Sequence, residues 1–155
     1  MSDKKILAVS SSGGHWIQLQ RLRFDLLDKH QTSYMGTAIG MQDLVEGKPF
    51  FVVQDCNINE PLNTLRCFFQ VLSVVRKVRP DFIVSTGAAP GLLTLLAGKL
   101  TGAKTIWIDS LANTKKLSVS GKLAGYFVDL WLTQWPELGA SGNGKKGPEY
   151  KGQLI

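Results

Sequence analysis

The sequence predicts an α/β protein with a Rossmann-like, mostly parallel sheet and helices on both of its faces. Short apolar runs typical of strands alternate along the chain with longer helical patterns, as in sheets whose strands are joined by crossover helices. A glycine-rich turn directly follows the first apolar run and leads into a helix. With 155 residues, of which 44% are hydrophobic, the chain is long enough for one substantial core and too short for two ordinary domains.

The elements are expected in a regular order. Strands are predicted at 5–10, 32–36, 50–54, 81–85, 104–109 and 129–134, and helices at 15–29, 62–79, 90–101 and 120–128. The long helix is the best marked, because Pro61 lies near its start, Pro80 follows its end, and one of its faces is apolar: Leu62, Leu65, Phe69, Leu72 and Val75. Residues 1–138 form the expected domain. Residues 139–155, rich in Gly, Lys and Ser, are expected to be a flexible tail or a docking segment ordered by a partner.

The first glycine turn, Ser11-Ser12-Gly13-Gly14-His15, has the composition of an anion site. Glycine lets the backbone approach a phosphate closely, and the N–H groups and dipole of the following helix stabilise negative charge. His15, at the start of that helix, would touch the bound group. The alternative is an ordinary strand-to-helix turn with an incidental histidine.

A second loop repeats this pattern. Small residues, Thr86, Gly87, Ala88 and Gly91, surround the start of a helix that Pro90 marks. Ligands of open α/β sheets bind beyond the carboxyl ends of the strands, where this loop, the first loop and the polar segment 109–116 are all expected. Two such glycine loops side by side would hold a diphosphate, although a tight turn that lets the helix pack closely on the sheet is the alternative.

Several site types are excluded by their missing patterns. The turn lacks the G-x-G-x-x-G sequence and the second strand ends without an acidic residue, which argues against NAD. No Walker A sequence and no Asp-x-Asp pair is present, and Cys56 and Cys67 match no zinc or redox spacing, so they are expected to be buried thiols. We therefore expect neither a cofactor nor a metal.

Charge and hydropathy suggest where the protein acts. The 18 basic residues exceed the 12 acidic ones, and the net charge of +6 favours an anionic partner without choosing among phosphates, lipid headgroups and nucleic acid. The N-terminus lacks a signal-peptide pattern, and the most apolar stretch is shorter than the ~20 residues that span a bilayer. We expect a cytoplasmic protein with peripheral membrane contact through Trp16, Arg21 and Arg23 in the first helix and through Leu92–Leu96 beside Lys99.

Four motifs in the same order carry a resemblance over nearly the whole chain. They are Ser11–His15, Ile108-Asp109-Ser110-Leu111-Ala112, Leu117–Leu123 and Gln134-Trp135-Pro136-Glu137-Leu138. The chain resembles the family of the membrane-anchor subunit of the eukaryotic dolichol-linked chitobiose-forming N-acetylglucosaminyltransferase, whose bacterial members belong to polysaccharide and capsule clusters. Its glycine loops are more weakly similar to the acceptor-side domain of the peptidoglycan N-acetylglucosaminyltransferase.

The resemblance implies the N-terminal half of a two-domain (GT-B type) glycosyltransferase, with the donor-binding half on a separate polypeptide. It implies that both glycine loops hold the diphosphate of a polyprenyl-linked acceptor, that His15 is the base beside the acceptor hydroxyl, and that Asp109 stands where many relatives carry glutamate. Ser110, Asn113 and Lys115 would belong to the acceptor loop. By this resemblance the sequence departs from the eukaryotic relatives at Asn113, where they carry arginine, and we expect the protein to lack their N-terminal anchor.

The function expected from the resemblance is that of an acceptor-binding subunit of a split inverting glycosyltransferase. It would transfer a sugar from a nucleotide donor to a polyprenyl-diphosphate-linked saccharide at the inner face of the membrane, in exopolysaccharide or capsule synthesis. No nucleic-acid partner is expected. A non-catalytic enhancer that stabilises and recruits a partner transferase is the alternative, followed by a self-sufficient phosphate-binding module.

Overall fold

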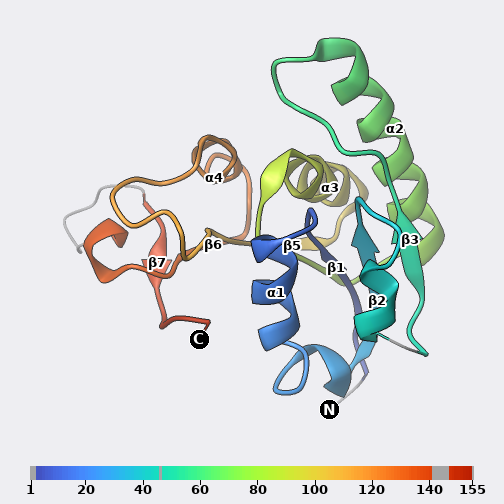
Figure 1. Cartoon of the computed structure of the whole chain (residues 1–155), viewed down its shortest axis with the longest axis horizontal. Helices are drawn as coiled ribbons and strands as arrows, with labels where there is room; N and C mark the ends of the chain where they lie inside the picture. Colours follow the sequence, from blue (N-terminus) through green and yellow to red (C-terminus); the bar gives the residue numbers. More distant parts are fainter. Residues whose placement is uncertain (1–2, 46, 141–146, 155) are drawn as a thin grey trace.

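Seven parallel strands form one sheet in the computed structural model of the chain, which describes residues 3–45, 47–140 and 147–154 (Figure 1). The strand order is β3-β2-β1-β4-β5-β6-β7. The strands are β1 (Lys5–Val9), β2 (Gln31–Gly36), β3 (Phe50–Val52), β4 (Phe82–Ser85), β5 (Lys104–Ile108), β6 (Leu130–Thr133) and β7 (Glu149–Tyr150). This is the doubly wound Rossmann order extended by one edge strand, so the predicted fold class is confirmed.

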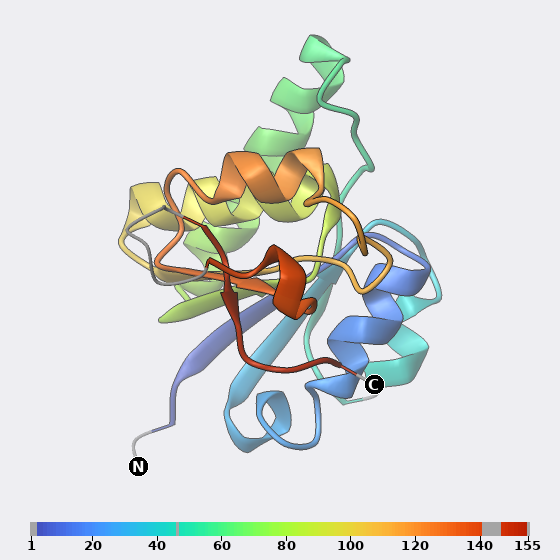
Figure 2. The same cartoon turned by 90° about the vertical axis from the view of Figure 1, so that its left-hand side faces the viewer.

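Helices cover both faces of the sheet because side chains alternate along each strand. On β1, Leu7 and Val9 pack toward α2 (Pro61–Val78), α3 (Ala88–Thr101) and α4 (Val119–Ala124). Ile6 and Ala8 point the other way and pack with the side chains of α1 (Gly14–Arg21). Figures 1 and 2 show α1 on one side of the sheet and the other three helices on the opposite side.

The long helix α2 starts and stops as the prolines predict. Pro61 is its first residue, Arg79 adopts the left-handed conformation after its last turn, and Pro80 follows. Its buried face, however, consists of Cys67, Val71 and Val75. The residues Leu62, Leu65 and Phe69 of the predicted apolar face are 75%, 52% and 60% exposed.

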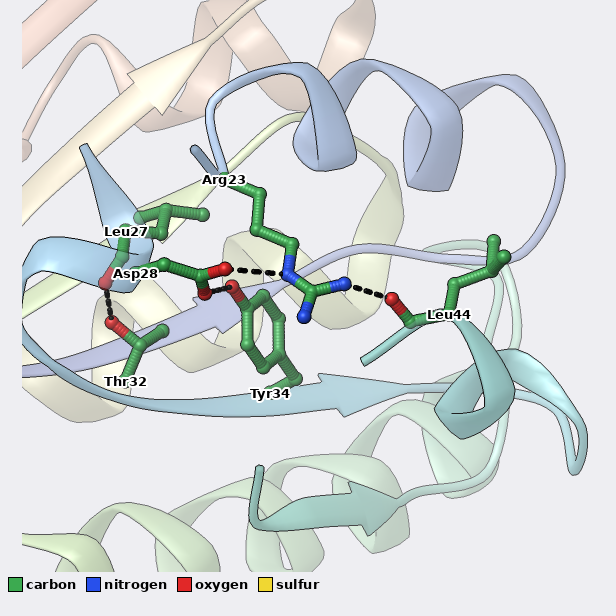
Figure 3. A network of polar contacts seen from close by, with 6 residues as sticks. All are labelled: Arg23, Leu27, Asp28, Thr32, Tyr34 and Leu44. Carbon is green, nitrogen blue, oxygen red and sulfur yellow. Dashed lines mark hydrogen bonds and ion pairs between the residues drawn. The ribbon is translucent and has the colours of Figure 1, made fainter. Parts of the chain in front are cut away.

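The first helix is shorter than predicted and ends at Arg21, not at residue 29. Beyond it the chain turns into the short 3-10 helix η1 (Leu27–Lys29), where Asp28 accepts a bond from Arg23 Nε at 2.8 Å (Figure 3). The Tyr34 hydroxyl of β2 donates to the same carboxylate at 3.3 Å. Burial, together with the nearby Asp28 charge, raises the pKa of Tyr34 well above its ordinary value. These contacts hold the turn that follows α1 against β2.

The described part of segment 139–155 lies against the sheet. Strand β7 pairs in parallel with β6, where Leu132 is opposite Glu149 and Thr133 is opposite Tyr150. Near the C-terminus the Leu154 N–H donates to Gln134 Oε1 at 2.8 Å. Residues 141–146, which include two lysines of the predicted tail, and residue 155 lie outside the described residues. The domain boundary at residue 138 stays a prediction.

Candidate functional site

The two glycine loops meet at the point where the strand order reverses. Strands β1 and β4 are neighbours in the sheet, and the helices that follow them, α1 and α3, lie on opposite faces. The Thr86 hydroxyl donates to the carbonyl oxygen of His15 at 2.7 Å, and His15 Nδ1 lies 3.1 Å from the carbonyl oxygen of Thr86. These two bonds hold the two loops side by side.

The contact with Thr86 fixes the tautomer of His15. A backbone carbonyl only accepts hydrogen bonds, so Nδ1 must carry the hydrogen in that contact. In the neutral ring the lone pair then belongs to Nε2, the nitrogen of a proton acceptor. Gly87 leaves the space for this ring, because a Cβ there would lie 2.3 Å from His15 Nδ1.

Both helix starts at the site lack a side-chain cap. Gly13 precedes α1 with a φ of 82°, and Gly87 precedes α3 with a φ of 151°. Neither residue has a side chain that could satisfy the first N–H groups of its helix, in contrast to Ser118, which accepts from Gly121 N at the start of α4. Ala88, the first residue of α3, is left-handed with a φ of 69°, a strained conformation of the kind that clusters at functional sites. Two uncapped helix starts favour an anionic ligand.

Two open pockets adjoin these helix starts and share lining residues. A pocket of about 270 Å³ lies beside His15, with Ser110, Asn113 and Ser118 at its wall. A larger pocket of about 600 Å³ lies beside Ser11 and the segment Asp55–Asn59. Ala88, Val119 and Ser120 line both pockets, so the start of α3 lies between them.

Asp109 is 2% exposed and organises the loop that follows β5. One carboxylate oxygen accepts from Ser118 N at 3.0 Å. The other accepts from the Ser118 hydroxyl at 2.6 Å and, more weakly, from Trp107 Nε1 and Asn113 Nδ2 at 3.4 Å. Protein groups donate to both oxygens, and the carboxylate thereby holds Ser118 and Asn113 in place at the wall of the smaller pocket.

Two buried glutamines that the sequence reasoning missed support the same loop. Gln18 of α1 accepts from Leu111 N at 3.1 Å and donates to the Ser110 hydroxyl at 3.2 Å. Gln134 donates to Gln18 Oε1 at 2.7 Å and to the carbonyl oxygen of Asp109 at 2.9 Å. Both glutamines are buried. A polar residue at a core-facing position of the first helix was the signal by which the sequence could have revealed Gln18.

The remaining predicted residues differ in their surroundings. Ser12 N donates to the Thr37 hydroxyl at 3.2 Å, which leaves fewer free donors in the first turn. Gly91 faces the sheet, where a Cβ would lie 2.1 Å from Ser85 Oγ, so this glycine allows close helix packing. Lys115 is exposed on the loop.

Burial rules out Trp16, Leu92 and Leu95 among the predicted membrane-contact residues, whereas membrane contact through the exposed Arg21 and Lys99 stays a prediction. Trp16 is buried and forms edge-on contacts with Tyr34 and Phe50. Arg21 donates to the carbonyl oxygen of Leu154, Arg23 pairs with Asp28, and Lys99 pairs with Asp129 at 2.7 Å. Leu92 and Leu95 belong to the core. The apolar side chains that local hydropathy suggested for membrane contact therefore pack against the sheet instead.

No helix in the described part of the chain is both long enough and apolar enough to span a membrane. Within the same residues, no group of three or more His, Cys, Asp or Glu side chains could hold a metal ion.

Several solved structures share this fold at low sequence identity. MurG of Acinetobacter baumannii superposes with a TM-score of 0.77 over 96% of this chain and 45% of that protein, at 14% identity. A UDP-GlcNAc 2-epimerase of Neisseria meningitidis, solved with UDP-GlcNAc, superposes with a TM-score of 0.66 over 86% of this chain and 41% of the epimerase, at 16% identity. These likenesses show the fold alone.

The sequence shows the family. The profile described as "Oligosaccharide biosynthesis protein Alg14 like" matches residues 49–154, and the chain belongs to this family. The UDP-N-acetylglucosamine transferase subunit ALG14 of Eremothecium gossypii is 32% identical over 49% of this chain and 39% of its own length. The rat subunit of the same name is 25% identical over 89% of this chain and 59% of its own length. The chain thus spans less than two thirds of the length of these relatives.

Proposed function

We propose that this protein is the acceptor-binding subunit of a split inverting glycosyltransferase. It binds a polyprenyl-diphosphate-linked saccharide, and a separate subunit supplies the nucleotide-sugar donor, a UDP-sugar, in bacterial exopolysaccharide or capsule synthesis. The observation that supports this most directly is the pair of uncapped helix starts joined by His15 and Thr86 at the switch point. The named relatives are subunits of a UDP-N-acetylglucosamine transferase, which supports the need for a partner chain.

In this proposal the loops and His15 have separate roles. N–H groups of Gly13–Gly14 and Ala88–Ala89 at the two helix starts stabilise the diphosphate. His15 Nε2 takes the proton of the acceptor hydroxyl as that oxygen forms its bond to the anomeric carbon of the donor. The bond from the anomeric carbon to the nucleoside diphosphate breaks on the opposite face, which inverts the configuration. Thr86 holds the ring in the tautomer that this step requires.

The protein acts at the cytoplasmic face of the cell membrane, because its acceptor is lipid-linked. The larger pocket beside Ser11 and Asn57 provides room for acceptor groups next to the helix starts. Ser110 and Asn113 at the smaller pocket, with Lys115 further along the loop, contact the saccharide.

The test is reconstitution with the donor subunit. The purified chain alone should transfer no sugar, whereas the complex should be active on a lipid-linked acceptor. In the complex, His15→Ala should lower turnover by ~10²–10⁴-fold while co-purification of the subunits persists. Turnover by the single chain would contradict the split-enzyme proposal.

A non-catalytic enhancer is the second candidate, and the surroundings of Asp109 favour it, because this carboxylate is 2% exposed and protein groups donate to both of its oxygens. In that case His15→Ala would lower turnover of the complex by less than about threefold, well below the usual effect of losing an acid–base group.

A further inference from the structure

A series of buried hydrogen bonds runs from the C-terminal segment to the smaller pocket beside His15. It begins where the end of the described chain crosses over to α1, with the Leu154 N–H donating to Gln134 Oε1 at 2.8 Å (Figure 2). Gln134 donates to Gln18, and Gln18 donates to Ser110, which lines the smaller pocket. We call this series of bonds the glutamine relay. Gln134, Gln18 and Ser110 are 1%, 9% and 6% exposed, so water hardly competes for these bonds.

Backbone groups fix the orientation of both glutamine amides in the relay. A backbone N–H only donates and a backbone carbonyl only accepts. The Leu154 N–H therefore faces Gln134 Oε1, and the carbonyl oxygen of Asp109 faces Gln134 Nε2 at 2.9 Å. Gln18 is fixed in the same way, because its Oε1 accepts from Leu111 N at 3.1 Å. Each amide thus has one orientation that satisfies its backbone partners.

Ser110, at the end of the relay, is left as a hydrogen-bond donor. Its hydroxyl oxygen accepts from Gln18 Nε2 at 3.2 Å and from Ala112 N at 3.2 Å. A hydroxyl has two lone pairs and one hydrogen, so both lone pairs are used and only the hydrogen remains. Within the described part of the chain no group accepts a bond from this hydroxyl. The hydrogen is therefore available to an oxygen atom bound in the smaller pocket.

The smaller pocket thereby presents one donor and one acceptor. The donor is the Ser110 hydroxyl, and the acceptor is His15 Nε2, because His15 Nδ1 carries the hydrogen of the contact with Thr86. A hydroxyl group both donates and accepts, whereas the oxygens of an ionised diphosphate only accept. The two groups therefore match a substrate hydroxyl better than they match the diphosphate.

We propose that Ser110 donates to the attacking hydroxyl oxygen of the acceptor, and that Gln18 and Gln134 are positioning residues that fix Ser110 as a donor. The proposal rests on the proposed function for its substrate. The hydroxyl gives its proton to His15 Nε2 and accepts from Ser110 with one lone pair. Its second lone pair forms the bond to the anomeric carbon, as the bond from that carbon to the nucleoside diphosphate breaks and the leaving group departs with the electron pair. The two contacts thus orient the attacking oxygen.

The experiment is steady-state kinetics of the complex with the donor subunit, on a short-chain, water-soluble prenyl-diphosphate-linked acceptor. Ser110→Ala removes the donor, and kcat should fall ~10–10²-fold because the attacking oxygen is no longer oriented. KM should change less than about threefold, because the rest of the acceptor is still bound. Gln18→Glu keeps the shape of the side chain and turns an acceptor oxygen toward Ser110. The Ser110 hydrogen then points to the new carboxylate and not into the pocket, so kcat should fall to a similar extent.

The matched control is Gln20→Glu, which adds the same charge to the same helix. Gln20 Nε2 has no partner among the described residues, and the relay does not pass through this side chain. Its kcat should stay within about threefold of the parent complex at a temperature where all variants are folded. Calorimetry of the isolated chain with inorganic diphosphate provides a second control, because Ser110→Ala and Gln18→Glu should leave that affinity unchanged.

The direction of the relay has its own readout in the isolated chain. In NMR spectra the side-chain NH₂ protons of Gln18 should show nuclear Overhauser effects to the Cβ protons of Ser110. Effects from these NH₂ protons to the amide proton of Leu111 instead would show the reversed orientation and overturn the donor role of Ser110.

Three kinetic or binding results would also overturn the proposal and leave the proposed function intact. They are a kcat equal to that of the parent complex in Ser110→Ala and Gln18→Glu, an equal loss in Gln20→Glu, and a loss of diphosphate affinity that accounts for the loss in turnover. The last result would assign the Ser110 hydroxyl to the diphosphate. A parent complex that transfers no sugar would instead overturn the proposed function, and with it the contact of Ser110 with an attacking oxygen.

Discussion

At the scale of single residues, Gly87 decides the position of the candidate base. A Cβ on this residue would lie 2.3 Å from His15 Nδ1, and the φ of 151° disfavours any side chain. Gly87→Ala should therefore displace His15 and break its bond to Thr86. Misplacement of a reacting group by ~1 Å costs about 10²-fold, so turnover of the reconstituted complex should fall by that order.

The control for this variant is Gly102→Ala, where the added Cβ meets no atom within 4 Å despite the positive φ. Both variants strain the backbone, and only Gly87→Ala should affect transfer at a temperature where both are folded. Equal activity losses in the two variants would show that backbone strain, and not displacement of His15, causes the loss.

A second prediction at the scale of single residues concerns Asp109 and the thermal stability of the protein. Asp109→Asn replaces one acceptor oxygen by an amide nitrogen, so some of the donors from Ser118, Trp107 and Asn113 lose their acceptor in a buried environment. An unsatisfied buried donor costs ~1–3 kcal/mol, and we expect the melting temperature to fall by roughly 5 °C. Thermal unfolding followed by circular dichroism measures it. An unchanged melting temperature with lost turnover would instead indicate a direct role in the reaction.

At the scale of elements, Asp129 ties α3 and β5 to the start of β6. Its carboxylate accepts from Lys99 Nζ at 2.7 Å and from Thr105 N at 2.8 Å. The bond from Lys99, with those from Thr105, holds the pKa of Asp129 below its ordinary value. A lowered pKa in the folded state contributes stability above the unfolded pKa, and this contribution is lost as the pH falls through the folded pKa.

Asp129→Asn should therefore lower the free energy of unfolding at neutral pH, and the gap to the parent chain should shrink as the pH drops below about 4. Urea unfolding across this pH range provides the measurement. Because the pair is partly exposed, added salt should narrow the gap as well. A difference in unfolding free energy between the variant and the parent chain that widens toward low pH would contradict a lowered pKa of Asp129 in the folded state.

At the scale of the whole molecule, the C-terminal segment closes one edge of the sheet. It contributes β7 beside β6, the bond from Leu154 N to Gln134, and the Leu154 carbonyl that accepts from Arg21. Deletion of residues 147–155 should expose the edge of β6 and lower the melting temperature by ~3–6 °C, because several backbone and buried polar bonds are lost. Leu154→Ser, which keeps the backbone bonds, should lower it less.

Co-purification of this deletion variant with the donor subunit tests the docking role expected for residues 139–155. Loss of the complex at a temperature where the variant is folded supports a docking role, whereas full retention assigns docking to the rest of the domain.

The sequence by itself determined the fold class and the two glycine loops, because strand alternation, helix-bounding prolines and glycine positions are local signals. Tertiary structure alone decided three further matters. It ended the first helix at Arg21 and placed the following turn against β2, where Asp28 bonds to Arg23 and Tyr34. It buried Trp16 and left Leu62 exposed, since one apolar residue meets the sheet and the other projects past it. It brought His15 against Thr86, because only the strand order places β1 beside β4.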